Sequence, residues 1–161
     1  MNELKDKIFQ AQSEGDIASL YVLEAQAHET FYEDTLMAYY ANILDLALER
    51  LTNALENLEK LDMNEVQDFA TLRALYEYAI EHYSAGSVTD ASALFEVLGG
   101  LSNDEPFSHS MKIHRAACDQ SIPFDDFIDD YVDMHATQNT GKFYITVFTP
   151  KSETLSTGDN K

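Results

Sequence analysis

The sequence predicts an all-α fold of six to seven helices with one C-terminal β-strand. Apolar residues recur at helical spacing over most of the chain, and Gly and Pro fall between the periodic segments. Only 143–148 is continuously β-branched or aromatic, which indicates a strand. The chain has 161 residues, of which 45% are hydrophobic. We therefore expect a single helical domain over 1–150 and a disordered tail over 151–161.

Three helices are expected in the first 61 residues. A short one covers 2–13, and a second begins at the capping residue Asp16 and reaches Phe31. The third covers 35–61, and its apolar residues alternate in spacing between three and four: Met37, Tyr40, Leu44, Ala47, Leu51, Ala54, Leu58 and Leu61. Further apolar residues widen this seam, so we expect it to pack on more than one neighbour (Leu36, Ile43, Leu48, Leu55). A coiled-coil homodimer is the alternative.

Capping residues, glycines and prolines divide the remainder of the chain. Asn64 with Gln67 predicts the start of a helix to about Ser84, and a pairing of Ser87 with Asp90 predicts the start of the next, over 88–98. Gly99 and Gly100 are expected to end it. Two more helices are predicted to begin at Pro106 and Pro123 and to reach Asp119 and Asp133, and a loop over 138–141 precedes the strand. That strand needs a pairing partner: its symmetry mate, another protein or an unrecognised strand of this chain.

Negative charge is the outlying feature of the composition. The chain has 29 Asp and Glu against 10 Lys and Arg, a formal net charge of -19. Nucleic-acid backbones and anionic lipids attract Lys and Arg, so we expect neither to bind directly. The charge either only keeps the chain soluble, attracts a basic protein, or imitates a nucleic acid. A single cysteine, no signal peptide and no apolar stretch of membrane-spanning length favour the cytoplasm.

Residues 72–105 have the pattern of a tight helical hairpin. Small residues, Ala79 and Ala91, stand where two antiparallel helices would cross, and Gly86 supplies the turn. Larger side chains surround them (Leu75, Tyr78, Tyr83, Phe95, Leu98). This pattern resembles a tetratricopeptide repeat. A weaker second copy over 116–134 is the only other candidate repeat.

Within that superfamily, 72–79, 83–86, Asp90, Ala91 and Phe95 are similar to the first repeat of the class II chaperones of type III secretion. The resemblance implies an acidic, cytoplasmic helical protein whose concave groove binds an extended segment of a secreted translocator. Two features depart from the family: about 70 residues precede the motif, and a strand is predicted at the end.

No pattern of catalytic or metal-ligating residues is recognisable. The pairs Glu24 with His28 and Glu77 with Glu81 lack the Glu-x-x-His spacing of di-iron bundles, so neither a metal nor a cofactor is expected. His114 and Cys118 lie four residues apart, but the neighbouring alanines indicate a packed helix crossing, where a free cysteine is inert. We therefore expect a protein that is not an enzyme.

The candidate partner-binding residues are aromatic and acidic. Tyr76 is expected to line a peptide groove, whereas Tyr78 and Tyr83 are expected in the core. Asp90 and a cluster of five aspartates are expected to hold Lys or Arg of a partner (Asp125, Asp126, Asp129, Asp130, Asp133). The sequence thus favours an acidic protein-binding module or chaperone-like adaptor. A nucleic-acid mimic that inhibits a DNA-binding protein is the alternative.

Overall fold

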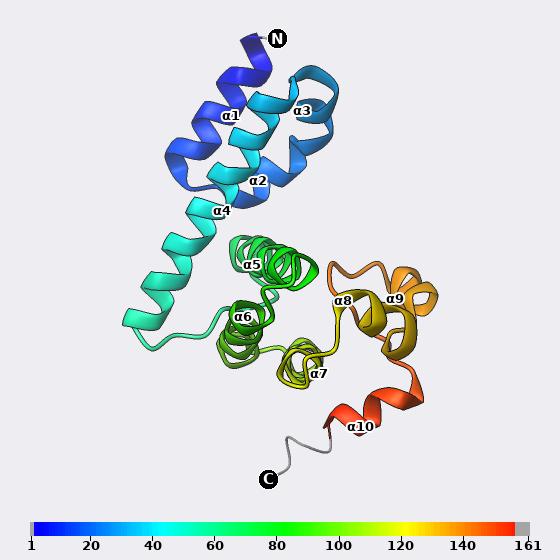
Figure 1. The fold of residues 1–161 in the computed structure, drawn as a ribbon. Coiled ribbons are helices and arrows are strands. Elements are labelled where there is room, and N and C mark those ends of the chain that lie inside the picture. The colour runs from blue at the N-terminus through cyan, green and yellow to red at the C-terminus, as the bar shows by residue number, and fades with distance from the viewer. Residues whose placement is uncertain (1, 157–161) are drawn as a thin grey trace. The chain divides into compact units, whose positions relative to one another are not determined.

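The computed structural model describes residues 2–156, which contain ten α-helices, one π-helix and one 3-10 helix (Figure 1). The predicted all-α class is therefore confirmed, with more and shorter helices than the six to seven expected. The chain divides into two compact units, Met1–Ala74 and Leu75–Lys161. That residues 1–150 fold as one domain stays a prediction.

The N-terminal unit contains α1 (Asn2–Glu14), α2 (Ile17–Val22), α3 (Glu24–Thr30), α4 (Glu33–Glu56) and the first part of α5 (Val66–Ser84). Helix α2 packs against both α1 and α4. The predicted helix from Asp16 to Phe31 is divided at Leu23 into α2 and α3. The hydroxyl of Tyr39 in α4 donates a hydrogen bond to the carbonyl of Leu20, one of the groups that the end of α2 leaves unpaired.

Helix α4 buries only part of the predicted seam, Ala47 and Ala54. The side chains that it buries are Tyr39, Ile43, Ala47 and Ala54, whereas Met37 of the predicted seam is 64% exposed. The helix also ends at Glu56 and does not reach residue 61, because Leu58 takes a left-handed φ of 55°. The amide of Glu59 then donates to the carbonyl of Ala54 at 2.9 Å, which closes the helix end.

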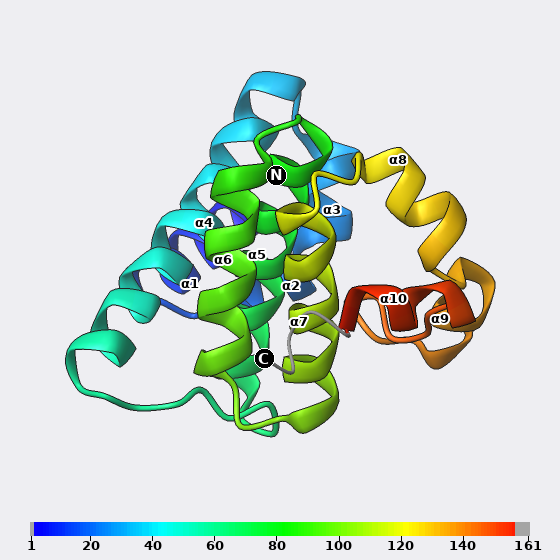
Figure 2. The ribbon, with the colours of Figure 1, turned by 60° about the horizontal axis from the view of Figure 1, so that its bottom comes forward.

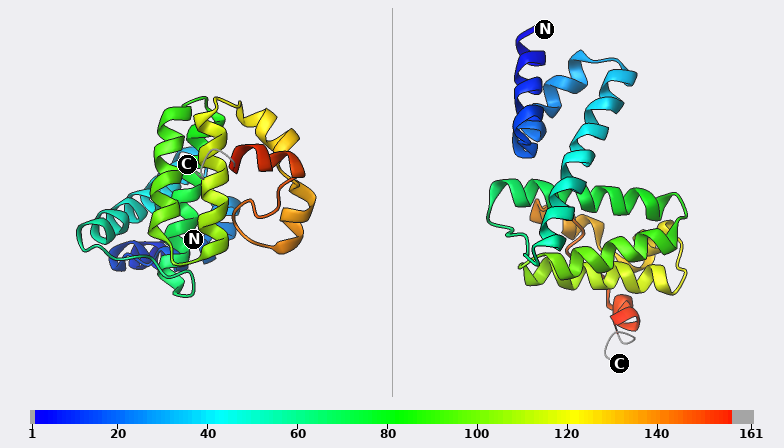
Figure 3. Two further views of the ribbon diagram at one scale, coloured as in Figure 1. Left: turned by 90° about the horizontal axis from the view of Figure 1, so that it is seen from below. Right: turned by 90° about the vertical axis from the view of Figure 1, so that its left-hand side faces the viewer.

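The C-terminal unit contains the rest of α5, then α6 (Val88–Leu101), α7 (Glu105–Asp119), α8 (Phe124–Asp126), the π-helix η1 (Phe127–Tyr131), α9 (Met134–Thr140), the 3-10 helix η2 (Pro150–Ser152) and α10 (Glu153–Ser156). Helices α6 and α7 run side by side (Figures 2 and 3). Gly99 lies inside α6 against α7: a Cβ there would meet the Cβ of Met111 at 3.5 Å. The prediction that α6 ends at Gly99 and Gly100 is therefore wrong, since the helix continues to Leu101. Gly99 instead lets α6 and α7 approach closely.

The hairpin expected between α5 and α6 has its small residues in the interior. Ala79 and Ala91 are fully buried, and Gly86 makes the turn with a φ of 90°. The ring of Phe95 lies 6.3 Å from the ring of Tyr83 between centroids. The predicted pairing of Ser87 with Asp90 is absent, since Ser87 makes no side-chain capping bond. Helix α7 does begin beside Pro106 as predicted, where Asp104 accepts a hydrogen bond from the amide of Phe107.

The predicted strand over 143–148 is wrong: this segment forms only one antiparallel bridge, between Val132 and Phe148. Side chains satisfy much of its backbone instead. The amide of Ile145 donates to the hydroxyl of Tyr76 at 3.2 Å, and its carbonyl accepts from the hydroxyl of Ser110. The amide of Val147 donates to the hydroxyl of Thr137 at 3.1 Å. With these partners the extended segment needs no neighbouring strand.

His114 joins these side chains into one buried network. Its Nδ1 donates to the carbonyl of Ser110 at 2.7 Å, so its Nε2 accepts from the hydroxyl of Tyr76 at 2.9 Å. The ring is fully buried, and burial lowers the pKa of His114 to about 4. The imidazole is therefore neutral at physiological pH, as the hydrogen bond that Nε2 accepts from Tyr76 requires.

The chain end also differs from the expected loop and tail. Residues 138–140 belong to α9, which Gly141 ends in the left-handed conformation with a φ of 69°. Residues 150–156 are helical, because Leu155 is buried where α10 packs against α7. Residues 157–161 of the predicted tail lie outside the described residues. No helix in the described part of the chain is long and apolar enough to cross a membrane.

The buried histidine generates a pH dependence that a variant can isolate. The unfolded chain binds a proton at His114 below a pH of about 6.5, whereas the folded chain binds one only below about 4. Stability is therefore lost as the pH falls through this window. Relative to His114→Gln, the unfolding free energy of the wild type should fall by about 3 kcal/mol between pH 7 and pH 4 in urea titrations. If the unfolding free energies of the two proteins changed in parallel with pH, His114 would not be the group responsible.

Candidate functional site

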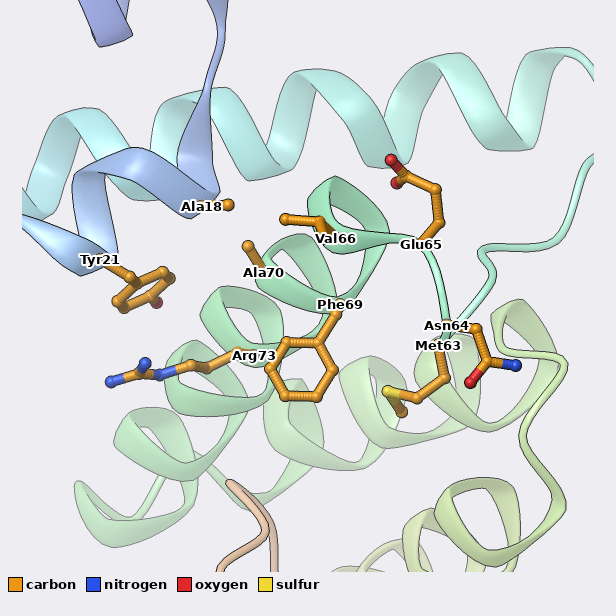
Figure 4. Close-up of a pocket in the computed structure, with 9 residues that line it drawn as sticks. All are labelled: Ala18, Tyr21, Met63, Asn64, Glu65, Val66, Phe69, Ala70 and Arg73. Atoms are coloured by element: carbon orange, nitrogen blue, oxygen red, sulfur yellow. The ribbon is translucent and has the colours of Figure 1, made fainter.

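An apolar groove of about 310 Å³ opens in the N-terminal unit between α2 and the start of α5 (Figure 4). Ala18 and Ala70 lie where the two helices face each other, and Phe69 lies between Arg73 at one end and Met63 at the other. Its lining residues are Ala18, Tyr21, Met63, Asn64, Glu65, Val66, Phe69, Ala70 and Arg73. Val66 is 65% exposed although it is large and apolar. The groove thus offers an unburied apolar surface with polar ends.

A polar clamp holds α2 against α5 beside the groove. The side chain of Gln67 accepts from the amide of Ala18 at 3.2 Å and donates to Asp16. Asp16 in turn caps α2 by accepting from the amide of Ser19 at 3.0 Å. Hydrogen bonds from Ser19 and Gln67 lower the pKa of Asp16 below its usual value, so the carboxylate stays charged at neutral pH. This clamp sets the distance between Ala18 and Ala70.

An ion cluster positions the loop that forms the other end of the groove. Arg50 of α4 bonds to Glu59 at 2.7 Å and to the buried Asp68 of α5 at 3.2 Å. Asp68 also accepts from the amide of Asp62 at 3.0 Å. These bonds tie residues 59–62 to two helices, and so place Met63 and Asn64 at the groove.

Arg73 is held rigidly at its end of the groove. Its guanidinium stacks on the ring of Tyr21, 3.8 Å from the ring centroid, and lies 3.4 Å from a carboxylate oxygen of Glu24. Glu24 also accepts a hydrogen bond from Tyr40, whose hydroxyl contacts Nε2 of His28 at 2.6 Å. Because the stack fixes both side chains, a bound segment meets a preformed wall, which lowers the entropic cost of binding.

Large exposed apolar side chains are concentrated in the N-terminal unit. Over residues 2–156, the large hydrophobic side chains that stay exposed all precede residue 75: Phe9, Val22, Tyr32, Met37, Leu55, Leu58, Val66 and Phe69. Concentrations of exposed apolar surface commonly mark interaction sites. The exposed apolar surface therefore belongs to one of the two units.

The five predicted aspartates are all exposed and form an acidic face in the C-terminal unit. This acidic face comprises Asp125, Asp126, Asp129, Asp130 and Asp133. The continuous helix predicted from Pro123 is wrong, because α8 passes into the π-helix η1, which ends at Tyr131. Phe127 is fully buried beneath the face. Lys151 lies 3.7 Å from Asp130, and Asp133 caps α9 through the amide of Ala136.

Tyr76 does not lie in a groove. It is only 4% exposed, because its hydroxyl bonds to His114 and Ile145 inside the C-terminal unit, so the prediction of a surface Tyr76 is wrong. Tyr83 is buried as expected, and Tyr78 is half-buried. Asp90 is exposed in the first turn of α6, on a different helix from the acidic face.

The groove itself escaped sequence reasoning. Val66 and Phe69 resemble ordinary members of a buried helix face, because Leu72, Leu75 and Tyr76 further along the same helix are buried. No local pattern separates these two side chains from buried ones, because their exposure depends on which neighbouring helices cover the start of α5.

The remaining reactive groups are enclosed. Cys118 is buried, and burial raises the pKa of its thiol to about 12, so little nucleophilic thiolate exists at neutral pH. Its helical neighbour His114 is occupied by Tyr76 and Ser110. Within the described residues, no group of three or more His, Cys, Asp and Glu side chains could hold a metal ion.

No protein-family model matches the chain, and comparisons with curated proteins and with solved structures give no match either. The groove, the exposed apolar side chains and the acidic face are therefore the observations on which a function rests.

The polar clamp can be tested by removing Gln67. We expect Gln67→Ala to lower the unfolding free energy by about 1–2 kcal/mol in urea titrations, because Asp16 and the amide of Ala18 both lose a partner. Gln10→Ala is the matched control: Gln10 is exposed, and its side chain bonds to Glu14, one turn along α1. Equal effects of the two substitutions would show that the clamp does not hold α2.

Proposed function

We propose that this chain is a protein-binding module, a chaperone-like adaptor that holds a segment of a partner protein in the groove of the N-terminal unit. The observation that carries the proposal is the unburied apolar surface of Val66 and Phe69 beside a preformed wall of Tyr21 and Arg73. Covering such surface is favourable by about 25 cal/mol per Å² of apolar area.

The dimensions of the groove suit a short segment. A cavity of about 310 Å³ is at the lower limit of sites that enclose a whole small molecule, but it can receive a few side chains of a peptide. Small residues, Ala18 and Ala70, let a backbone approach closely. An extended segment with apolar side chains fits these constraints.

Charge selects the kind of partner. A net charge of -19 attracts basic proteins and speeds their encounter, and the exposed acidic face provides carboxylates for their Lys and Arg. Apolar contacts in the groove then slow dissociation. The buried Ala79 and Ala91 and the turn at Gly86 support the tetratricopeptide-like resemblance, and with it an adaptor role.

A nucleic-acid mimic is the second candidate, and the acidic face is the observation that favours it. Over residues 2–156, Asp130 is the one of its five carboxylates that forms an ion pair, with Lys151. A mimic would bind a DNA-binding protein almost wholly through charge, so its affinity would depend steeply on salt and not on apolar side chains.

Photo-crosslinking in the cells that produce the protein tests the groove. With benzoylphenylalanine in place of Phe69, we expect one dominant crosslinked protein, because this position lines the groove. Position 9 is the matched control, since Phe9 is also an exposed phenylalanine but does not line the groove. With the purified partner, Phe69→Ala should weaken binding about tenfold and Phe9→Ala about twofold or less, measured by calorimetry.

Two results would count against the adaptor. Equal crosslinking at both positions would show that the groove is not the binding site. If binding survives Phe69→Ala but is abolished by replacing Asp125, Asp126, Asp129 and Asp130 with Asn, and by about 300 mM salt, the mimic is the better account. Asp133 is kept in this variant because it caps α9.

A further inference from the structure

A second apolar stripe follows α4 beside the one that the N-terminal unit buries. We call it the α4 stripe: Met37, Ala41, Leu44, Leu48, Leu51 and Leu55 on the helix, and Leu58 in the turn after it. Met37, Ala41, Leu55 and Leu58 are exposed, and the other three are half-buried. The buried stripe of Tyr39, Ile43, Ala47 and Ala54 lies about 100° away around the helix, at about 100° per residue. We propose that the α4 stripe docks a basic amphipathic α-helix of a partner protein.

The spacing of the stripe specifies a helical occupant. Its members follow one another at intervals of four and three in strict alternation, which is the seam spacing of a coiled coil. Such a seam is complementary to another helix with apolar residues at the same period, because side chains of each fit between four of the other. An extended strand, whose side chains alternate every two residues, has no matching period.

Leu58 gives an independent reason to assign a partner to this stripe. It has a left-handed φ of 55°, which glycine normally provides at a helix end, and its side chain is 94% exposed. The chain thus keeps a strained backbone at a residue whose apolar side chain contacts almost nothing in the described structure. Strained residues of this kind cluster at binding sites.

Charge decides what kind of helix the stripe receives. Exposed carboxylates follow the side of the stripe that faces away from the buried stripe: Asp34, Asp45, Glu49 and Glu56. None of the described ion pairs includes them, and Arg50, the one basic residue of α4, is bound to Glu59 and Asp68. A second copy of this chain would bring its own carboxylates against these. A helix with Lys or Arg beside its apolar seam is complementary.

The test uses two synthetic helical peptides of 24 residues with the intact chain. Both have Leu at the seam positions; one has Lys and the other Glu beside the seam. By calorimetry at low salt, we expect the Lys peptide to bind at least about tenfold more tightly than the Glu peptide. Leu55→Asn should weaken the Lys peptide about tenfold, whereas Val22→Asn, at an exposed position off the stripe, should not.

Leu58→Gly separates binding from stability. We expect it to raise the urea midpoint, because glycine relieves the left-handed strain, and yet to weaken the Lys peptide about tenfold. Phe69→Ala should leave this peptide's affinity unchanged, so that failure of the groove and failure of the stripe are distinguishable.

Three outcomes would overturn the proposal. Equal affinity for the Lys and Glu peptides would show unspecific apolar adhesion. Loss of binding in Phe69→Ala but not in Leu55→Asn would place the peptide in the groove. A dimer in light scattering that Leu55→Asn abolishes would make a second copy of this chain the occupant.

Discussion

One neutral, fully buried histidine holds the C-terminal unit together. His114 binds Tyr76 and the carbonyl of Ser110, and the hydroxyls of Tyr76 and Ser110 in turn bind the two backbone groups of Ile145. A charged imidazole at this depth would lack compensation, so the network exists only while the ring is neutral. Because side chains of α5 and α7 satisfy the extended segment, it closes the core without a sheet. The ring of Tyr144 then packs against Phe107 at 4.9 Å between centroids.

The two units differ in how completely they bury their apolar residues, and this difference organises the proposed function. Among its described residues the C-terminal unit leaves no large hydrophobic side chain exposed, and the acidic face lies over the buried Phe127. In the N-terminal unit, the buried contacts are made by α1, α2 and one side of α4. The groove and the α4 stripe stay uncovered. Long-range charge brings a partner close, whereas apolar contact keeps it bound. We thus expect charged side chains to attract the partner and apolar side chains to keep it bound, so that mutations can separate the two effects.

Local patterns predicted what depends on local physics. The start of α7 beside Pro106 and the turn at Gly86 follow from backbone preferences that one residue sets. The strand over 143–148 was wrong because its partners, Tyr76 and Ser110, lie 69 and 35 residues away, and no local pattern reports them. In α4 two apolar registers overlap, so periodicity alone could not show which one the core uses. The five aspartates of the acidic face are exposed, since charged residues stay hydrated, but their binding of a partner stays a prediction, and the groove depends on the Asp16–Gln67 clamp across 51 residues.

Amide hydrogen exchange at Ile145 tests the central claim, that side chains replace a strand in closing the C-terminal unit. We expect slow exchange at Ile145 in the wild type, as in a core element, although the residue lies in no strand or helix. Tyr76→Phe should accelerate it at least about tenfold and change the amide of Val147, which binds Thr137, far less. Fast exchange at Ile145 in the wild type, or equal acceleration at both amides, would contradict the claim. The description of the C-terminal unit as a closed core would then be wrong. The proposal that the N-terminal unit holds the partner, which rests on that contrast, would have to be given up.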